Sequence, residues 1–203
     1  MLLSGAGLVL ASPVGMVIAA AIKLTDGGPV FFTQERVGKG GRVFESFKFR
    51  SMVPDADKKL GTGQVMLAVP ALQATEHDPR VTAVGRLLRT TAMDELPQLL
   101  NIFRGDMSFV GPRALATSEV EVGASGEARE LRTIPGFAKR HSVTPGLTGI
   151  AQVYAPRDIP RRHKFRYDRI YVDNSSFWLD LKLICLSFWI TFRGKWEVRE
   201  KKL

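Results

Sequence analysis

Two adjacent carboxylates, Asp94 and Glu95 in the stretch TTAMDELPQLLNIF, are the residues of this sequence best suited to covalent chemistry. They stand at the predicted start of a helix, where acidic side chains offset the positive helix end and cap its free N–H groups. A carboxylate can also attack phosphorus, which gives an aspartyl-phosphate and divides one transfer into two easier steps. The pair is therefore open to two interpretations, a helix cap or a reacting centre.

The charges around the pair favour a reacting centre that handles phosphate. Arginines flank it on both sides in the sequence: Arg80, Arg86, Arg89, Arg104 and Arg113. One guanidinium group can donate two parallel hydrogen bonds to the oxygens of a phosphate. A divalent metal ion would neutralise a diphosphate enough for a carboxylate to approach it. The sequence contains no Walker A motif, no H-E-x-x-H and no Cys-x-x-Cys, so no other pattern competes with the carboxylate pair.

Two short amphipathic helices and a preceding hairpin must position the carboxylates. Apolar residues recur at helical spacing over 84–88 and 96–103, with Pro97 in the first turn of the second helix. The stretch 28–52 predicts two short strands around the turn GKGG. Such a basic glycine-rich turn can cradle a phosphate, but hairpin turns have this composition far more often. We expect an α+β fold that is predominantly helical, with a small antiparallel β-hairpin.

The N-terminal segment is apolar enough to enter a membrane. Residues 1–22 carry no charged side chain and, as a straight helix, would reach about 33 Å, roughly one hydrocarbon core. Pro13 cannot donate to the carbonyl of Val9, so a kink is predicted at Ser12-Pro13, where the Ser12 hydroxyl can satisfy a freed carbonyl. These residues alone support equally a spanning helix and a re-entrant helix that returns to the same face.

The chain is strongly basic. Its 29 Lys and Arg against 20 Asp and Glu give a formal net charge of +9, which favours an anionic membrane surface, a phosphorylated substrate or nucleic acid. The aromatic residues lie in apolar segments, so nucleic acid is not an expected partner. A basic cluster fits either a solvated helix face or contact with lipid head groups or nucleotide phosphates. It comprises Arg157, Arg161, Arg162, Lys164, Arg166 and Arg169.

The last apolar run, residues 183–192, is too short to span a membrane. Trp178, Trp189 and Trp196 lie in or beside it, and a basic tail follows. This pattern predicts an amphipathic helix lying in the membrane interface. Docking of the helix on the protein's own core is the alternative.

Three long stretches resemble the bacterial sugar transferases, the monotopic phosphoglycosyl transferases that act on polyprenol phosphate. They are GPVFFTQERVGKGGRVFESFKFRSM, DPRVTAVGRLLRTTAMDELPQLLNIFRGDMSFVGPR and VTPGLTGIAQV. The resemblance implies transfer of a phosphosugar from a UDP-sugar to undecaprenyl phosphate, with release of UMP, as the first membrane step of exopolysaccharide or glycoconjugate synthesis. It also implies a re-entrant helix over 1–24 kinked at Ser12-Pro13. The catalytic domain, 25–203, would then lie on the cytoplasmic face of the bacterial inner membrane.

The same resemblance implies roles for individual residues. Asp94 would be the nucleophile, and Glu95 would help to hold Mg²⁺, together with Asp94, or assist deprotonation of the acceptor. Arg113 in GPR would bind phosphate, and further candidates for that task are Lys48, Arg50 and Arg80. The family pattern commonly reads G-P-R-P, so Ala114 in place of the last proline leaves the identity of the sugar open.

A peripheral membrane adaptor is the alternative from another functional class. It would bind anionic lipid through its basic face and use Asp94 and Glu95 only as a helix cap. As a cap, Asp94 would contribute about 0.5–2 kcal/mol to stability. A catalytic carboxylate among arginines can instead be stability-neutral to remove and yet abolish activity.

Overall fold

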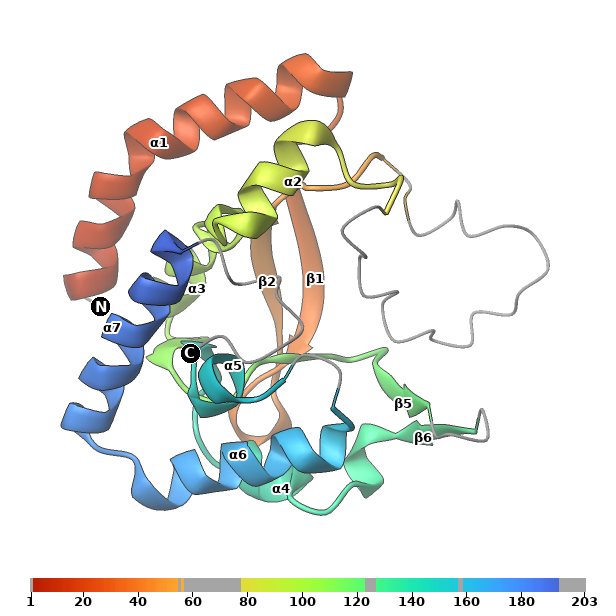
Figure 1. Cartoon of the computed structure of the whole chain (residues 1–203), viewed down its shortest axis with the longest axis vertical. Coiled ribbons are helices and arrows are strands. Elements are labelled where there is room, and N and C mark those ends of the chain that lie inside the picture. Colours follow the sequence, from red (N-terminus) through yellow and green to blue (C-terminus); the bar gives the residue numbers. More distant parts are fainter. Residues whose placement is uncertain (1, 55, 57–77, 123–126, 157–158, 194–203) are drawn as a thin grey trace.

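The computed structural model describes residues 2–54, 56, 78–122, 127–156 and 159–193 (Figure 1). The helices in these ranges are α1 (Leu2–Asp26), α2 (Ala83–Thr90), α3 (Gln98–Arg104), α4 (Phe137–Arg140), α5 (Ile150–Tyr154), α6 (Arg161–Asn174) and α7 (Phe177–Phe192). The strands are β1 (Phe31–Val37), β2 (Val43–Phe49), β3 (Ser108–Val110), β4 (Leu115–Ala116), β5 (Val120–Val122), β6 (Ala128–Glu130) and β7 (Gly146–Thr148). Three 3-10 turns complete the described part: η1 (Lys39–Gly41), η2 (Met93–Glu95) and η3 (Leu131–Thr133). The predominantly helical fold with few strands is as expected.

The predicted antiparallel hairpin is formed by β1 and β2. Phe31 lies opposite Phe49 at one end and Val37 opposite Val43 at the other. The GKGG stretch makes the turn, and the Gly40 N–H donates to the carbonyl of His141 at 2.7 Å. The protein itself uses this N–H, and phosphate binding by the turn stays an untested alternative. The short strand β4 extends the sheet on the other side of β1, which the sequence did not predict.

A short parallel pair, β3 with β7, joins two stretches that are far apart in the sequence. Ser108 lies opposite Gly146 and Val110 opposite Thr148. A Cβ atom on Gly146 would stand 2.0 Å from the backbone nitrogen of Gly111, so no side chain fits at that position. The pairing therefore brings the GPR stretch beside VTPGLTG.

Local signals begin and end the two helices that flank the carboxylate pair. The Thr82 hydroxyl caps α2 by accepting the Gly85 N–H at 2.9 Å. Gly105, with φ of 84°, ends α3 in the left-handed conformation that glycine adopts readily. The sequence predicted both helices, and the structure confirms them.

Helix α1 is continuous through Pro13 and runs across α2 and α3 (Figure 1). Ser12 Oγ donates to the carbonyl of Val9 at 2.8 Å, which is the carbonyl that Pro13 leaves without its helical donor. The predicted role of the Ser12 hydroxyl is thus confirmed. Ile18 and Ile22 on the inner side pack into a cluster with Phe49 and Leu88.

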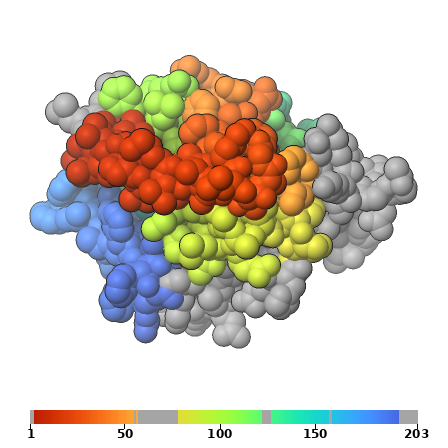
Figure 2. Space-filling model, turned by 90° about the horizontal axis from the view of Figure 1, so that it is seen from above, coloured from red at the N-terminus to blue at the C-terminus, as the bar shows by residue number. Residues whose placement is uncertain are grey.

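The outer side of α1 is apolar and exposed. Over Leu3–Asp26 this helix is long and apolar enough to cross a membrane by length and composition, with a mean hydropathy of 2.0. Figure 2 shows α1 lying across one face of the molecule with α2 alongside. The exposed large side chains are Leu3, Val9, Leu10, Val14, Met16, Val17 and Leu24. The spanning and the re-entrant arrangements both stay predictions.

Helix α7 combines both predicted interpretations of the last apolar run. Leu183 and Ile190 are fully buried in a cluster with Val110, Val153 and Tyr171, so the helix is docked on the core. It also exposes an aromatic surface made by Phe177, Trp178, Phe188, Trp189 and Phe192. Placement of this surface in a membrane interface stays a prediction, and Trp196 lies outside the described residues.

Candidate active site

Asp94 and Glu95 lie in the 3-10 turn η2, between α2 and α3. Ala92, just before this turn, has φ of 54° and separates it from α2. The residues preceding η2 and α3, Ala92 and Pro97, make no side-chain capping hydrogen bond, and α3 begins only at Gln98. The predicted helix start at the pair is a 3-10 turn, and the α-helix itself begins one turn later. Neither carboxylate makes a capping hydrogen bond to the described residues, and the adaptor interpretation stays a prediction.

Asn101 of α3 fixes the carboxylate pair against the hairpin. It is completely buried, accepts the Phe47 N–H at 3.0 Å and donates to the Glu45 carbonyl at 2.6 Å. Because β2 is the outer strand of its sheet, these backbone groups have no partner on a neighbouring strand. The Asn101 contacts thus hold α3, and the turn before it, beside Lys48 of β2.

Two cations contact Glu95, whereas Asp94 is less engaged. Lys48 Nζ stands 2.5 Å from Glu95 Oε1 but 4.0 Å from Asp94 Oδ2, and Arg113 Nη2 is 3.5 Å from Glu95 Oε1. No residue that the structure describes donates a hydrogen bond to Asp94. The side chains of Asp94 and Glu95 are 14% and 18% exposed, so both can be reached from solvent.

The surroundings shift the pKa values of Asp94 and Glu95 in opposite directions. Burial raises the pKa of Asp94 to about 6, with a further rise from the charge of Glu95 that Lys48 opposes. Burial also acts to raise the pKa of Glu95, but Lys48, Arg113 and then Arg36 lower it to about 2. Divergent acid constants in adjacent groups are typical of catalytic pairs with divided roles. At neutral pH Asp94 is ionised, partly exposed and only loosely held.

The backbone around Arg113 is fixed by the loop that carries VTPGLTG. The Gly111 N–H donates to the carbonyl of Thr148 at 2.9 Å, and the Gly146 N–H donates to the carbonyl of Pro112 at 3.0 Å. From α4, Arg140 Nη2 donates to the carbonyl of Arg113 at 2.5 Å. These bonds explain why two separate stretches of the sequence are needed to place one guanidinium beside Glu95.

The other predicted phosphate ligands form ion pairs with carboxylates outside the pair. Arg80 forms a two-pronged ion pair with Asp78, with Nε–Oδ1 at 3.0 Å and Nη2–Oδ2 at 2.7 Å. The buried Arg50 pairs with Asp26 at the end of α1. The structure therefore brings Lys48 and Arg113 to the carboxylates but not Arg50 or Arg80, whose roles in phosphate binding stay predictions.

Sequence reasoning missed several residues that line a small cavity at the pair. Its lining consists of Arg36, Ser46, Lys48, Glu95, Gln98, Met107, Arg113, Ala114, Gly146 and Leu147. A signal was present in the hairpin, because opposite residues of an antiparallel pair share one face. Gln34 lies opposite Ser46, and Arg36 opposite Phe44, in the register that also carries Lys48. Drawing this register places Arg36, Ser46 and Lys48 on one side.

The carboxylate pair is a limited but suitable set of Mg²⁺ ligands. Among the described residues, no three His, Cys, Asp or Glu side chains are grouped to hold a metal ion. Mg²⁺ usually takes one or two carboxylates together with substrate phosphates and water, which Asp94 and Glu95 can satisfy. Lys48, already at 2.5 Å from Glu95, is a competing cation at the same oxygen. Mg²⁺ stays a prediction.

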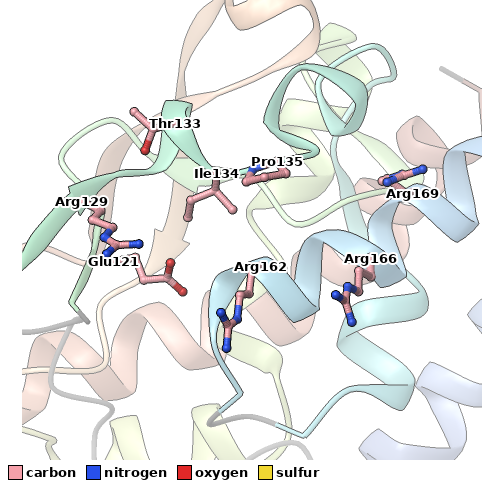
Figure 3. Close-up of a pocket in the computed structure, with 8 residues that line it drawn as sticks. All are labelled: Glu121, Arg129, Thr133, Ile134, Pro135, Arg162, Arg166 and Arg169. Atoms are coloured by element: carbon pink, nitrogen blue, oxygen red, sulfur yellow. The ribbon is translucent and has the colours of Figure 1, made fainter. Parts of the chain in front are cut away.

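Most of the described basic cluster lies along a separate cavity of about 400 Å³ between the β5–β6 hairpin, η3 and α6 (Figure 3). It is lined by Glu121, Arg129, Thr133, Ile134, Pro135, Arg162, Arg166 and Arg169 and includes neither carboxylate of the pair. Arg161 pairs instead with Glu119. Arg157 lies outside the described residues, and the choice between a solvated face and a phosphate contact stays a prediction.

Comparison with known proteins gives a consistent result. The family model described as bacterial sugar transferase matches residues 1–194. The chain is 42% identical over 194 residues to the UDP-glucose:undecaprenyl-phosphate glucose-1-phosphate transferase of Klebsiella pneumoniae, covering 93% of this chain and 38% of the relative. It is 39% identical over 178 residues to the UDP-N-acetylgalactosamine-undecaprenyl-phosphate N-acetylgalactosaminephosphotransferase of Aeromonas hydrophila, covering 86% and 38%.

A shorter relative is matched over most of its length. The exopolysaccharide production protein ExoY of Rhizobium meliloti is 37% identical over 188 residues, which cover 90% of this chain and 79% of ExoY. The chain thus spans 38% of the two longer transferases but most of ExoY.

Proposed function

The chain belongs to the bacterial sugar transferase family, and we propose that it moves a phosphosugar from a UDP-sugar to undecaprenyl phosphate and releases UMP. The names of two relatives contain UDP-glucose and UDP-N-acetylgalactosamine, which supports a UDP-sugar as the donor. Both names also contain undecaprenyl phosphate, which supports this lipid as the acceptor. One contrast in the site carries the proposal. Glu95 is held by Lys48 and Arg113, whereas Asp94 is partly exposed and accepts no hydrogen bond from the described residues.

The first step is attack by Asp94. A carboxylate oxygen of Asp94 forms a bond to the β-phosphorus of the donor. The bond from that phosphorus to the oxygen bridging the two phosphates breaks, and UMP leaves with the bonding electrons. The phosphosugar is then an acyl phosphate on Asp94. The raised pKa of about 6 still leaves the carboxylate ionised at neutral pH, as the attack requires.

The second step regenerates the enzyme. An oxygen of undecaprenyl phosphate attacks the same phosphorus, the bond to Asp94 breaks, and the carboxylate is restored. The lipid product carries the sugar through a diphosphate. Separate steps with one shared site give ping-pong kinetics.

Lys48 and Arg113 reduce the repulsion between an anionic nucleophile and an anionic diphosphate. Their nitrogen atoms lie within 2.5–4.0 Å of the carboxylate pair, close enough to contact a phosphate that enters beside it. Mg²⁺ bound by Glu95 and Asp94 would supply further neutralisation. With a pKa near 2, Glu95 is a poor proton acceptor, which favours a role in holding cations over deprotonation of the acceptor.

The proposed location is the cytoplasmic face of the bacterial inner membrane. It is supported by the exposed apolar side of α1, by the aromatic surface of α7 and by the excess of basic residues. The Ser12–Val9 hydrogen bond supports a re-entrant α1, because it satisfies a carbonyl that lipid would leave unpaired. Together these features would hold the reacting pair at the depth of the lipid phosphate.

The test uses purified protein with Mg²⁺, undecaprenyl phosphate and a panel of UDP-sugars, with UMP release as the readout. We expect turnover with at least one donor, loss of turnover with EDTA and recovery with added Mg²⁺. Asp173→Asn, which changes a half-exposed carboxylate on α6, serves as the matched control and should keep full activity. Absence of UMP release with every donor would contradict the proposed reaction.

A further inference from the structure

Arg36 of β1 is a fixed cation that forms no ion pair with a carboxylate of the described residues. Its Nη1 donates to the Ala114 carbonyl at 2.7 Å, and its Nη2 donates to Gln34 Oε1 at 2.6 Å. Its Nε is buried and has no hydrogen-bond partner among the described residues. Both acceptors are neutral, so they orient the guanidinium without neutralising its charge. Each terminal nitrogen uses one of its two N–H groups in these bonds, and the second is left for a ligand.

Other cations surround Arg36. Burial, and then the charges of Arg113 and Arg161, lower its pKa to about 10, while Glu95 acts in the opposite direction. Arg161 pairs with Glu119, and Arg113 shares Glu95 with Lys48. Of these three arginines, Arg36 is therefore the one without an ion pair to a carboxylate of the described residues. Holding like charges together in a buried site is unfavourable unless an anion joins them.

Three cations line the cavity at the carboxylate pair: Arg36, Lys48 and Arg113. Lys48 lies within 4.0 Å of Asp94, and Arg113 contacts the neighbouring Glu95. Arg36 forms no ion pair with either carboxylate, so its guanidinium is the one that a ligand in this cavity can engage without displacing Asp94 or Glu95. In a displacement at phosphorus, the leaving oxygen lies opposite the attacking one. A donor whose β-phosphorus faces Asp94 therefore directs its second phosphate away from Asp94, where Arg36 can meet it.

We propose that Arg36 binds the phosphate that leaves with the nucleotide. The inference rests on the proposed function and adds a leaving-group site to it. Arg36 lines the same small cavity as Lys48, Glu95 and Arg113, so it reaches the space beside the pair. The carbonyl that orients it belongs to Ala114, the position at which the sequence departs from G-P-R-P. Any residue supplies this carbonyl, so the departure leaves the phosphate site intact.

The test is direct binding of UMP and of uridine by calorimetry, without acceptor or turnover. Arg36→Gln should weaken UMP binding about 10- to 100-fold, as loss of charged hydrogen bonds predicts, and should leave uridine binding unchanged. Arg42→Gln is the matched control, because Arg42 belongs to the same hairpin and its side chain is 82% exposed. Its UMP affinity should stay within about twofold of the wild-type value.

The outcomes separate this inference from the proposed function. Unchanged UMP affinity in Arg36→Gln, or an equal loss for UMP and uridine, would overturn it, since the second result means general damage. If Arg36→Gln does not fold, Arg36→Lys decides, and unchanged UMP binding in that variant would overturn the inference. A wild-type protein that binds UMP in this way but transfers no phosphosugar would refute the proposed reaction alone. If the wild-type protein turns over but Arg36→Gln binds UMP as tightly as the wild type, this inference alone is refuted.

Discussion

Two groups of charged residues lie on either side of Arg113 and differ in how their charges are matched. Arg140 and Asp168 form a closed pair at 2.8 Å, with side chains only 2% and 4% exposed. At the carboxylate pair, Lys48 and Arg113 both contact Glu95, and Asp94 receives no hydrogen bond from the described residues. In the first group each charge is matched by its partner, whereas in the second the Asp94 carboxylate accepts no such hydrogen bond and can contact a ligand.

The comparison shows that burial alone does not identify a reactive carboxylate. Burial raises the pKa of both Asp94 and Asp168. Asp168 accepts a hydrogen bond from Arg140, which in turn fixes the carbonyl of Arg113. The pKa of Asp94 is raised as well, but its oxygens accept no hydrogen bond from the described residues. We infer that one pair maintains the geometry and the other performs the chemistry, and four predictions test this division.

The largest effect is expected on activity from Asp94→Asn. The amide keeps the shape of the side chain but cannot attack phosphorus, so UMP release should fall by at least about 10³-fold. Stability should be unchanged or slightly higher, because a partly buried charge without a hydrogen bond is removed. Turnover assays and urea unfolding measure the two quantities, and persistent turnover would remove Asp94 from the role of nucleophile.

The next effect is expected on stability from Asp168→Asn. This change leaves the buried Arg140 without an anion and should lower the free energy of unfolding by about 3–5 kcal/mol. Urea unfolding followed by circular dichroism measures the loss. The double variant Arg140→Met with Asp168→Leu is the control and should recover much of the stability. A loss below about 1 kcal/mol in Asp168→Asn would contradict the distinction between the two groups.

A smaller effect is expected from pH. Asp94 must be ionised to attack, so with a pKa of about 6 the single-turnover rate should fall about tenfold from pH 7 to pH 5. The folded state also holds this proton more tightly than the unfolded chain does. The resulting stability is complete below pH 3.8 and is lost as pH rises through about 6. Asp94→Asn should lack this dependence, and a flat rate profile in the wild type would contradict the raised pKa.

The smallest effect is expected from Asp173→Asn, which breaks a third ion pair. Lys139 Nζ lies 2.7 Å from Asp173 Oδ1, a distance similar to that of the buried pair, but both side chains are about half exposed. Solvent screening should make the change in the urea midpoint too small to resolve. A loss comparable to that of Asp168→Asn would mean that distance, and not burial, decides what an ion pair contributes.

Much of the hairpin and of the reacting pair could be predicted from the sequence. The turn GKGG between two stretches rich in aromatic residues predicts the hairpin of β1 and β2, and the two helices around the pair have clear apolar periodicity. Ser12 could be assigned to the carbonyl of Val9 because a proline removes a known donor. The resemblance added Lys48 and Arg113, which composition alone does not distinguish from other cations.

What the sequence could not supply are contacts between distant segments. The strands β3 and β7 have three residues each and pair in parallel, so neither has a periodic pattern of its own. The separate 3-10 turn at the pair was not predicted, because Ala92 takes a left-handed conformation that nothing in its residue type indicates. Arg36 was missed because its importance depends on the neutral acceptors that hold it, one of them the distant Ala114.

The central claim, covalent catalysis by Asp94, is tested most directly by mixing the protein with its UDP-sugar donor in the absence of undecaprenyl phosphate. Intact-protein mass spectrometry then measures any covalent adduct. The account predicts a burst of up to one UMP per protein and a mass increase equal to one phosphosugar, located at Asp94 by peptide mapping and absent from Asp94→Asn. UMP release that occurs only with the lipid acceptor, with no adduct on the protein at any time, would contradict it.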